Sequence, residues 1–250
     1  MSKCFYVTSC IDVESEVPFT YSSQRSFFSN EERFRQTIFT VNSIKCLCPD
    51  AHVYVIDTSK PNTTYEKILE SYDDVQYIPM IEYLNETEYK TITEGNHKTV
   101  GEITLLQSFI KNFKFEMQEY DHLFKLSGRY FLDNTFDSKK FKGKKIYFKT
   151  PLAFDWKDSW NYSMVDRRAE QNNNFLYQYC SVFYGYHSSY LDYFENLYAN
   201  VLEIIQDPDK KHYDIETLMY FLTRKDKKSI IEDNILVTGW DGSFGTFFRY

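Results

Sequence analysis

The sequence lacks any apolar run that approaches the roughly 20 residues needed for a transmembrane helix. This absence speaks against an integral membrane protein and leaves peripheral contact with a membrane as the closest association that we expect. The first four residues lead almost directly into a β-rich segment and carry no secretory signal. We therefore expect a cytoplasmic protein with no transmembrane segment.

Cysteine is scarce, and the number and spacing of the cysteines speak against a disulfide-stabilised protein and against a zinc-binding one. There are five cysteines, an odd number that does not suit a complete disulfide framework. Cys46 and Cys48 are separated by a single residue, which is not the spacing of a structural zinc site. Free thiols in a reducing compartment are the simplest interpretation.

Basic residues are outnumbered, since 29 Lys and Arg stand against 36 Asp and Glu, for a net charge of -7. A general nucleic-acid binder needs a basic surface, so we expect no nucleic-acid partner, although local basic pockets remain possible. The sequence also contains no HExxH, no phosphate-binding loop of the Walker type and no GxSxG motif. The absence of these three motifs speaks against a zinc metalloprotease, a P-loop nucleoside triphosphatase and a serine hydrolase, respectively.

What the sequence has in abundance is aromatic residues, with 22 Tyr and 22 Phe among 250 residues. Most of these reflect a general compositional bias, and a few are candidates for stacking on sugars. The length suits one large domain, and we find no linker, repeat or low-complexity tract.

Strand and helix patterns alternate along the chain. Strands are predicted at residues 5–11, 51–57 and 75–80, and helices from Ser29 or Asn30 to Pro49 and over 65–72. Such a β-α-β-α-β run predicts an α/β fold with a mixed, mainly parallel central sheet and helices on both faces. Later elements are strands at 125–130, 145–149 and 175–186, helices at 99–115, 188–206 and 214–224, and an insertion or flap at 155–174.

The most informative segment is the strand that carries Lys125, Ser127 and Arg129 into a glycine turn. Side chains alternate along a strand, so these three are expected on one face. Two cations on one buried face need either carboxylate partners, such as Asp121 or Asp133, or an anionic ligand. A diphosphate would satisfy both.

Polar residues at the ends of neighbouring elements would surround such a ligand. Asp57 ends the second strand and can accept from a ribose hydroxyl or a base N–H, or else serve as a cap or loop residue. Thr8 and Ser9 end the first strand beside it. Lys98 could reach a phosphate, whereas Glu102, at the start of the same helix, is better explained as a helix-dipole carboxylate.

Two further places carry carboxylates. Asp214 and Glu216 open the last helix, where a carboxylate is stabilised by the helix dipole but can also act as a general base. Trp240 and Asp241 lie in the glycine-rich loop 239–245, whose glycines permit close approach of the backbone to a ligand. Trp240 is a candidate for stacking on a sugar.

The order of these features resembles glycosyltransferases of the GT-A fold. Thr8 and Ser9 end a first strand, an acid ends the second, and the segments 124–132 and 180–186 look like those of small polysaccharide- or lipopolysaccharide-type transferases from bacteria and large viruses. The resemblance implies a Rossmann-like single domain over residues 1–250. Residues 1–137 would bind the nucleotide sugar and residues 138–250 the acceptor.

One departure from that family concerns metal binding. GT-A enzymes usually carry Asp-x-Asp at the strand end where this chain has Lys-Leu-Ser-Gly-Arg-Tyr, and that motif would hold a divalent cation on the donor diphosphate. Cations of the chain can neutralise a leaving diphosphate instead. We therefore expect no required metal, with Mn or Mg at Asp133 or Asp137 as the alternative.

The resemblance implies transfer of a sugar from a nucleoside diphosphate donor, with UDP as the expected nucleotide, to a hydroxyl of a glycan or glycolipid. The donor would contact Thr8, Ser9, Asp57, Lys98, Lys125, Ser127 and Arg129. The catalytic carboxylate would be Glu216, Asp214 or Asp241, and the acceptor would stack on Trp156, Trp160 or Trp240. Two rivals remain, namely a catalytically inactive carbohydrate- or nucleotide-sugar-binding protein on this fold and a sugar nucleotidyltransferase.

Overall fold

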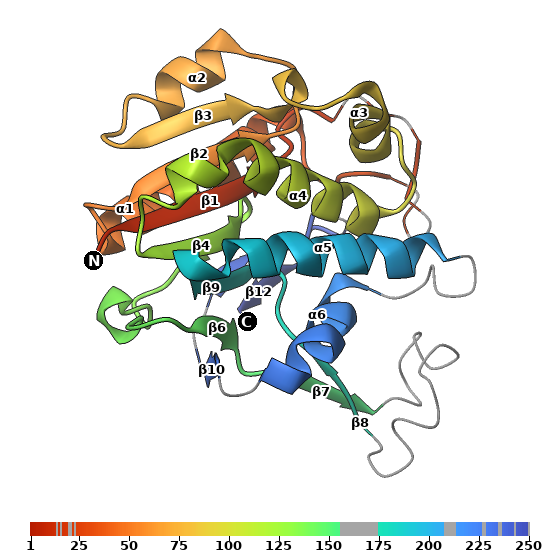
Figure 1. Ribbon diagram of the computed structural model, residues 1–250. Helices are drawn as coiled ribbons and strands as arrows, with labels where there is room; N and C mark the ends of the chain where they lie inside the picture. Colours follow the sequence, from red (N-terminus) through yellow and green to blue (C-terminus); the bar gives the residue numbers. More distant parts are fainter. Residues whose placement is uncertain are drawn as a thin grey trace.

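The computed structural model describes residues 1–13, 15, 17–19, 22, 24–155, 175–207, 214–226, 229–234, 237–242 and 244–249. Its centre is a seven-stranded sheet in the order β10-β6-β9-β4-β1-β2-β3 (Figure 1). These strands are β1 (Lys3–Ser9), β2 (His52–Asp57), β3 (Val75–Pro79), β4 (His122–Ser127), β6 (Ile146–Lys149), β9 (Phe183–His187) and β10 (Ile230–Asp233). Strands β3, β2, β1 and β4 are mutually parallel, and β9 runs antiparallel to β4 and β6. The predicted mixed, mainly parallel sheet is confirmed.

Helices cover both faces of this sheet, which also confirms the prediction. They are α1 (Asn30–Leu47), α2 (Thr63–Leu69), α3 (Glu86–Thr93), α4 (Lys98–Met117), α5 (Leu191–Gln206) and α6 (Ile215–Thr223). Because side chains alternate along β1, Phe5 packs in the core under α1 and α2, and Tyr6 packs in the core under α4, α5 and α6. Each face of the sheet therefore has its own apolar core.

Two smaller sheets complete the described part of the chain. Strands β5 (Tyr130–Leu132), β11 (Val237–Trp240) and β12 (Phe247–Arg249) form one, and β7 (Leu152–Asp155) pairs with β8 (Phe175–Gln178) in the other. Short 3-10 turns lie at Met80–Glu82, Ser138–Lys140, Ser188–Tyr190 and Arg224–Asp226. The pairing of β11 with β5 brings the glycine-rich loop 239–245 against the turn that follows β4.

Local sequence signals explain where the helices begin. Ser29 caps α1 in a capping box, because its side chain accepts from the Glu32 N–H while its own N–H donates to the Glu32 carboxylate at 2.8 Å. Asn62 caps α2, because its side-chain oxygen accepts from the Thr64 N–H at 3.0 Å. Asp214 caps α6, accepting from the Thr217 N–H at 2.7 Å. Of the two caps considered for α1, the structure has Ser29.

The strand predicted at 125–130 is interrupted at a glycine. β4 ends at Ser127, the Gly128 N–H donates to the Thr8 carbonyl at 2.8 Å as the last hydrogen bond to β1, and residues 128 and 129 then form a turn. Arg129 therefore lies in a turn and does not continue the face shared by Lys125 and Ser127. The single strand predicted at 175–186 is likewise two strands, β8 and β9.

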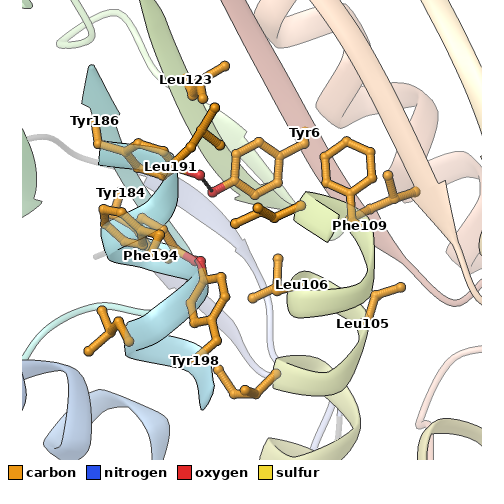
Figure 2. Close-up of a cluster of buried hydrophobic side chains, with 14 of the residues drawn as sticks. Tyr6, Leu105, Leu106, Phe109, Leu123, Tyr184, Tyr186, Leu191, Phe194 and Tyr198 are labelled. Carbon is orange, nitrogen blue, oxygen red and sulfur yellow. Dashed lines mark hydrogen bonds between the residues drawn. The ribbon is translucent and has the colours of Figure 1, made fainter. Parts of the chain in front are cut away.

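Many of the aromatic residues lie in the core. Figure 2 shows Tyr6, Tyr184, Tyr186 and Tyr198 converging with Phe194 between the sheet and helices α4 and α5. The four hydroxyls satisfy one another, since the Tyr6 hydroxyl donates to that of Tyr186 at 3.0 Å and those of Tyr184 and Tyr198 are paired. A core built from tyrosine thus avoids unpaired buried polar groups.

We expect Tyr186→Phe to lower the free energy of unfolding by about 1 to 2 kcal/mol, because it leaves the buried Tyr6 hydroxyl without its acceptor. The double variant Tyr6→Phe/Tyr186→Phe should lose less than the sum of the two single variants, since no hydroxyl is then left unpaired. Urea unfolding measures these losses, with Tyr83→Phe at a 44% exposed site as the control. Strictly additive losses would contradict this account of the core.

Candidate functional site

The carboxyl ends of β1 and β4 open into a cavity of about 400 Å³. Its walls come from the starts of α4 and α6, the turn after β4 and the loop after β11. In open α/β sheets, ligands bind at this edge. The cavity brings together eight residues that the sequence singled out, namely Thr8, Ser9, Lys98, Ser127, Arg129, Asp214, Glu216 and Asp241.

Two cationic side chains in the cavity, Lys98 and Arg129, have no carboxylate bound to them. Within the described residues, neither forms a hydrogen bond or ion pair through its charged group, and the Arg129 Nε atom is buried without a partner. Burial, and then the neighbouring Arg129 guanidinium, lower the pKa of Lys98. Two like charges in partly buried positions are unfavourable by themselves, and an anion placed between them would remove the conflict.

The backbone around Arg129 is tightly enclosed. The Trp240 N–H donates to the Arg129 carbonyl at 3.1 Å, which fixes the turn against β11. At Gly242 an added Cβ would lie 2.7 Å from the Arg129 Cζ atom and 2.8 Å from its Nε atom. The absence of a side chain at Gly242 thus leaves room for the guanidinium to face the cavity.

Carboxylates also line the cavity, and two of them come from the start of α6. The Ser181 hydroxyl donates to Glu216 Oε1. Burial, and then the neighbouring Asp214 carboxylate, raise the pKa of Glu216 to about 7, against the opposing hydrogen bond from Ser181. Asp214 itself accepts from the Thr217 N–H and from Gln178 Nε2, both at 2.7 Å, so both of its oxygens are used by the helix cap and its surroundings. Glu216 is therefore the carboxylate at the start of α6 that is available for proton transfer near neutral pH.

Lys125 lies beneath the cavity floor and does not line it. Its side chain has no exposed surface, and its Nζ atom donates to Glu102 Oε1 at 2.7 Å, Ser127 Oγ at 2.7 Å and the Ser181 carbonyl at 2.8 Å. All three donor protons of the ammonium are therefore used inside the protein. The sequence left two explanations for a buried cation at this position, a carboxylate partner or an anionic ligand. Lys125 has a carboxylate partner, which is Glu102 and neither Asp121 nor Asp133.

Asp57 also lies outside the cavity. It is fully buried, and its two oxygens accept from the Ile11 N–H at 2.9 Å and the Tyr77 hydroxyl at 2.8 Å. Burial raises the pKa of Asp57, and these hydrogen bonds oppose that rise. Asp57 thus holds the loop after β1 against β2 and β3, and its carboxylate has no free face toward a ribose.

The remaining predicted residues lie elsewhere. Asp133 accepts from Arg249 at 2.8 Å, and Asp137 caps the turn Ser138–Lys140. The Trp240 ring packs with Phe131 and Phe247 on the small sheet and is not part of the cavity lining. Trp156 and Trp160 lie outside the described residues.

The carboxylates of the cavity do not fit a resident divalent metal. Glu102 is bound by Lys125, and Asp214 is used by the cap of α6. In the ranges that the structure describes, no three His, Cys, Asp or Glu side chains gather in a way that would hold a metal ion. The alternative pair Asp133 and Asp137 serves an ion pair and a cap instead.

Several lining residues were not predicted as site residues. Glu102 follows Lys98 by four positions on α4, so helical spacing alone would have placed the two side chains on one side. Arg33 of α1 lines the cavity and donates to the Cys10 carbonyl at 2.5 Å and to Ser26 Oγ at 2.7 Å. Ser181 lies in the loop between β8 and β9, within the segment 180–186 that carries the family resemblance, but that resemblance did not single it out as a site residue.

Comparison with known proteins gives a fold but no sequence family. No protein-family model matches the chain, and no curated protein matches it in sequence. Core-mannan synthase A (CmsA/Ktr4) from Aspergillus fumigatus, in a Mn/GDP form, is similar in structure with a TM-score of 0.54 at 7% identity, over 95% of this chain and 74% of that one. The mannosyltransferase Ktr4p from S. cerevisiae has a TM-score of 0.54 at 10% identity, over 93% and 69%.

The chain has the GT-A fold. At such low identity the likeness establishes the fold alone. The GT-A-like expectation from the sequence is confirmed at that level, and the cavity lies at the sheet edge where a GT-A fold would be expected to bind a ligand. The described part of the chain contains no helix that is both long and apolar enough to cross a membrane.

We expect Gly242→Ala to weaken binding of inorganic pyrophosphate by about fivefold or more, because the new methyl group must displace the Arg129 guanidinium. Isothermal titration calorimetry measures this affinity. In an Arg129→Gln background the same glycine substitution should have little further effect. An equal loss in both backgrounds would show that Gly242 acts through the loop and not through Arg129.

Proposed function

We propose that the chain is a glycosyltransferase that moves a sugar from a nucleoside diphosphate donor to a hydroxyl of a glycan or glycolipid acceptor. The observation that carries this proposal is a pair of cations, Lys98 and Arg129, whose charged groups have no partner among the described residues, in a cavity at the carboxyl ends of parallel strands. The donor diphosphate supplies the anion that these groups lack. Sugar transfer, and not phosphate binding alone, is supported by the GT-A fold and by the carboxylate end of the same cavity.

The donor would extend along the cavity from β1 toward α6. Its nucleoside would lie over Thr8 and Ser9, and its diphosphate between Lys98 and Arg129. The sugar would then reach the end that contains Glu216. UDP is our proposed nucleotide. GDP is the rival to be tested beside it, because one of the similar structures was solved with GDP.

We propose that the cations of the chain stabilise the leaving diphosphate, and that transfer needs no divalent metal. As the bond from the anomeric carbon to the phosphate oxygen breaks, negative charge grows on the diphosphate. Positive charges already placed at that position lower the barrier, because they need no reorganisation during the reaction.

Glu216 is our proposed general base if the reaction inverts the anomeric centre. The acceptor oxygen then forms the new bond to the anomeric carbon while its proton passes to the carboxylate. A pKa near 7 suits this task, because the group is both substantially ionised and basic enough at neutral pH. Asp241 also lines the cavity and is the second choice, whereas the cap of α6 already uses Asp214.

The two halves of the chain would divide the substrates. Thr8, Lys98 and Arg129 come from residues 1–137, and Glu216 and Asp241 from residues 138–250, so both halves contribute to one cavity. Residues 1–137 are proposed to bind the donor and residues 138–250 the acceptor. Trp240 lies beside the cavity loop and remains a proposed stacking surface for the acceptor, together with Trp156 and Trp160. The protein is proposed to act in the cytoplasm.

Release of nucleoside diphosphate from a panel of UDP and GDP sugars tests the proposal, with EDTA and with Mn. We expect release with at least one donor, unchanged by EDTA. The pH profile of turnover should fall below about pH 7 and level off above it, because only the ionised Glu216 accepts a proton. Binding of a donor without any release would favour the inactive binding protein.

Glu216→Gln should lower turnover by roughly 100-fold or more and remove the acidic limb of the pH profile, because the amide cannot accept a proton. Affinity for the nucleoside diphosphate should stay within about twofold of the wild-type value, since Glu216 lies at the sugar end. Calorimetry and the release assay measure the two quantities separately. Near-wild-type turnover would show that Glu216 is not the base.

A further inference from the structure

The carboxylate of Glu102 is held in place by the cation beneath the cavity floor. Oε1 accepts from the Lys125 ammonium at 2.7 Å, and the Lys125 side chain has no exposed surface. Burial alone would raise the pKa of Glu102, but the ammonium groups of Lys125 and Lys98 outweigh it and hold that pKa below its usual value. Glu102 is therefore a fixed, ionised group in the wall of the cavity.

The second oxygen of this carboxylate is not used by the protein. Among the described residues, no group donates to Glu102 Oε2, and the side chain is 18% exposed. Glu102 lines the cavity, so this partial exposure is toward the cavity. An ionised oxygen in such a position needs donors from outside the protein, and the hydroxyl groups of a ligand supply them.

Hydrogen bonds through Lys125 and Ser181 connect Glu102 to Glu216, and both carboxylates line the cavity. Lys125 also binds the carbonyl of Ser181, and the hydroxyl of Ser181 donates to Glu216. After burial and Asp214, the Glu102 carboxylate is among the groups that raise the pKa of Glu216. The buried Lys125 thus holds Glu102 directly and is connected to Glu216 through Ser181.

We propose that Glu102 binds hydroxyl groups of the transferred sugar, and that the donor therefore carries a neutral, hydroxylated sugar and not a uronic acid. The inference rests on the proposed function, because it places a nucleotide sugar in this cavity. On the proposed function the diphosphate occupies Lys98 and Arg129, and the Lys125 ammonium is already used inside the protein, so none of these three cations would meet the carboxylate of a uronic acid. That carboxylate would face Glu102, and unpaired like charges in a desolvated site oppose binding strongly.

Calorimetry with three kinds of ligand tests the inference without relying on turnover. The probes are UDP, the pair UDP-glucose and UDP-glucuronate, and the pair UDP-galactose and UDP-galacturonate. The corresponding GDP compounds form a second set. We expect at least one neutral donor to bind about tenfold or more tightly than its uronate. Glu102→Gln should reduce that ratio to within about twofold, while affinity for the bare nucleoside diphosphate changes by less than twofold.

Glu102→Gln leaves the buried Lys125 ammonium without its carboxylate, so the double variant Lys125→Met/Glu102→Gln serves as a second test. It removes both charges and should show the same loss of discrimination. Urea unfolding establishes that each variant is folded before its ligands are compared.

Failure of this inference and failure of the proposed function would give different results. Equal or tighter binding of the uronate by the wild-type protein overturns the inference, as does an unchanged ratio in the folded Glu102 variants. A parallel loss of affinity for the diphosphate and for every donor would assign Glu102 a structural role and would overturn it too. If no nucleoside diphosphate binds to the wild-type protein, the proposed function fails and the inference fails with it.

Discussion

The site depends on two cationic side chains that share a cavity, with no carboxylate of the described residues bound to either. Lys98 begins α4, and Arg129 lies in the turn after β4. Both positions follow from the parallel pairing of β1 with β4, which brings strand ends and helix starts to one edge of the sheet. A fold that retains such a conflict of charge near its surface gains most when an anion binds. The diphosphate of a sugar donor is the anion that we propose for this position.

Lys125 shows that the same type of residue has a different role when its surroundings differ. It is completely buried, its three protons are all donated to protein oxygens, and its charge is matched by Glu102. Such a lysine has nothing to offer a ligand directly. Its effect on the cavity is indirect, because its partners Glu102, Ser127 and Ser181 all line it. Burial and hydrogen bonding, and not charge alone, separate the two kinds of lysine in this protein.

Much of the architecture could be predicted from local pattern. The order of strands and helices, the cap at Ser29 and the position of polar residues at strand ends follow from periodicity and capping preferences. Lys98, Arg129 and Glu216 were found by this route because each lies at the start or end of an element. Contacts between side chains that are distant in the sequence could not be predicted in the same way. The clearest case is Lys125, for which the sequence suggested Asp121 or Asp133 as the carboxylate partner, whereas the structure has Glu102.

Backbone geometry accounts for the other differences. The alternation rule placed Arg129 on the face of Lys125, but β4 ends at Ser127 and Arg129 lies in the turn that follows. Asp57 does end its strand as predicted, yet the loop after β1 folds over it and takes both oxygens. Such outcomes depend on how loops close over the sheet, which single-sequence patterns do not record.

The most direct test of the central claim compares binding of a nucleoside diphosphate with that of the matching monophosphate, by calorimetry in EDTA. The account predicts that the wild-type protein binds the diphosphate about 100-fold or more tightly, because the second phosphate meets Lys98 and Arg129. The variant Lys98→Gln/Arg129→Gln should bind the two nucleotides with similar affinity. A wild-type protein that does not distinguish them, or a double variant that still does, would contradict the account.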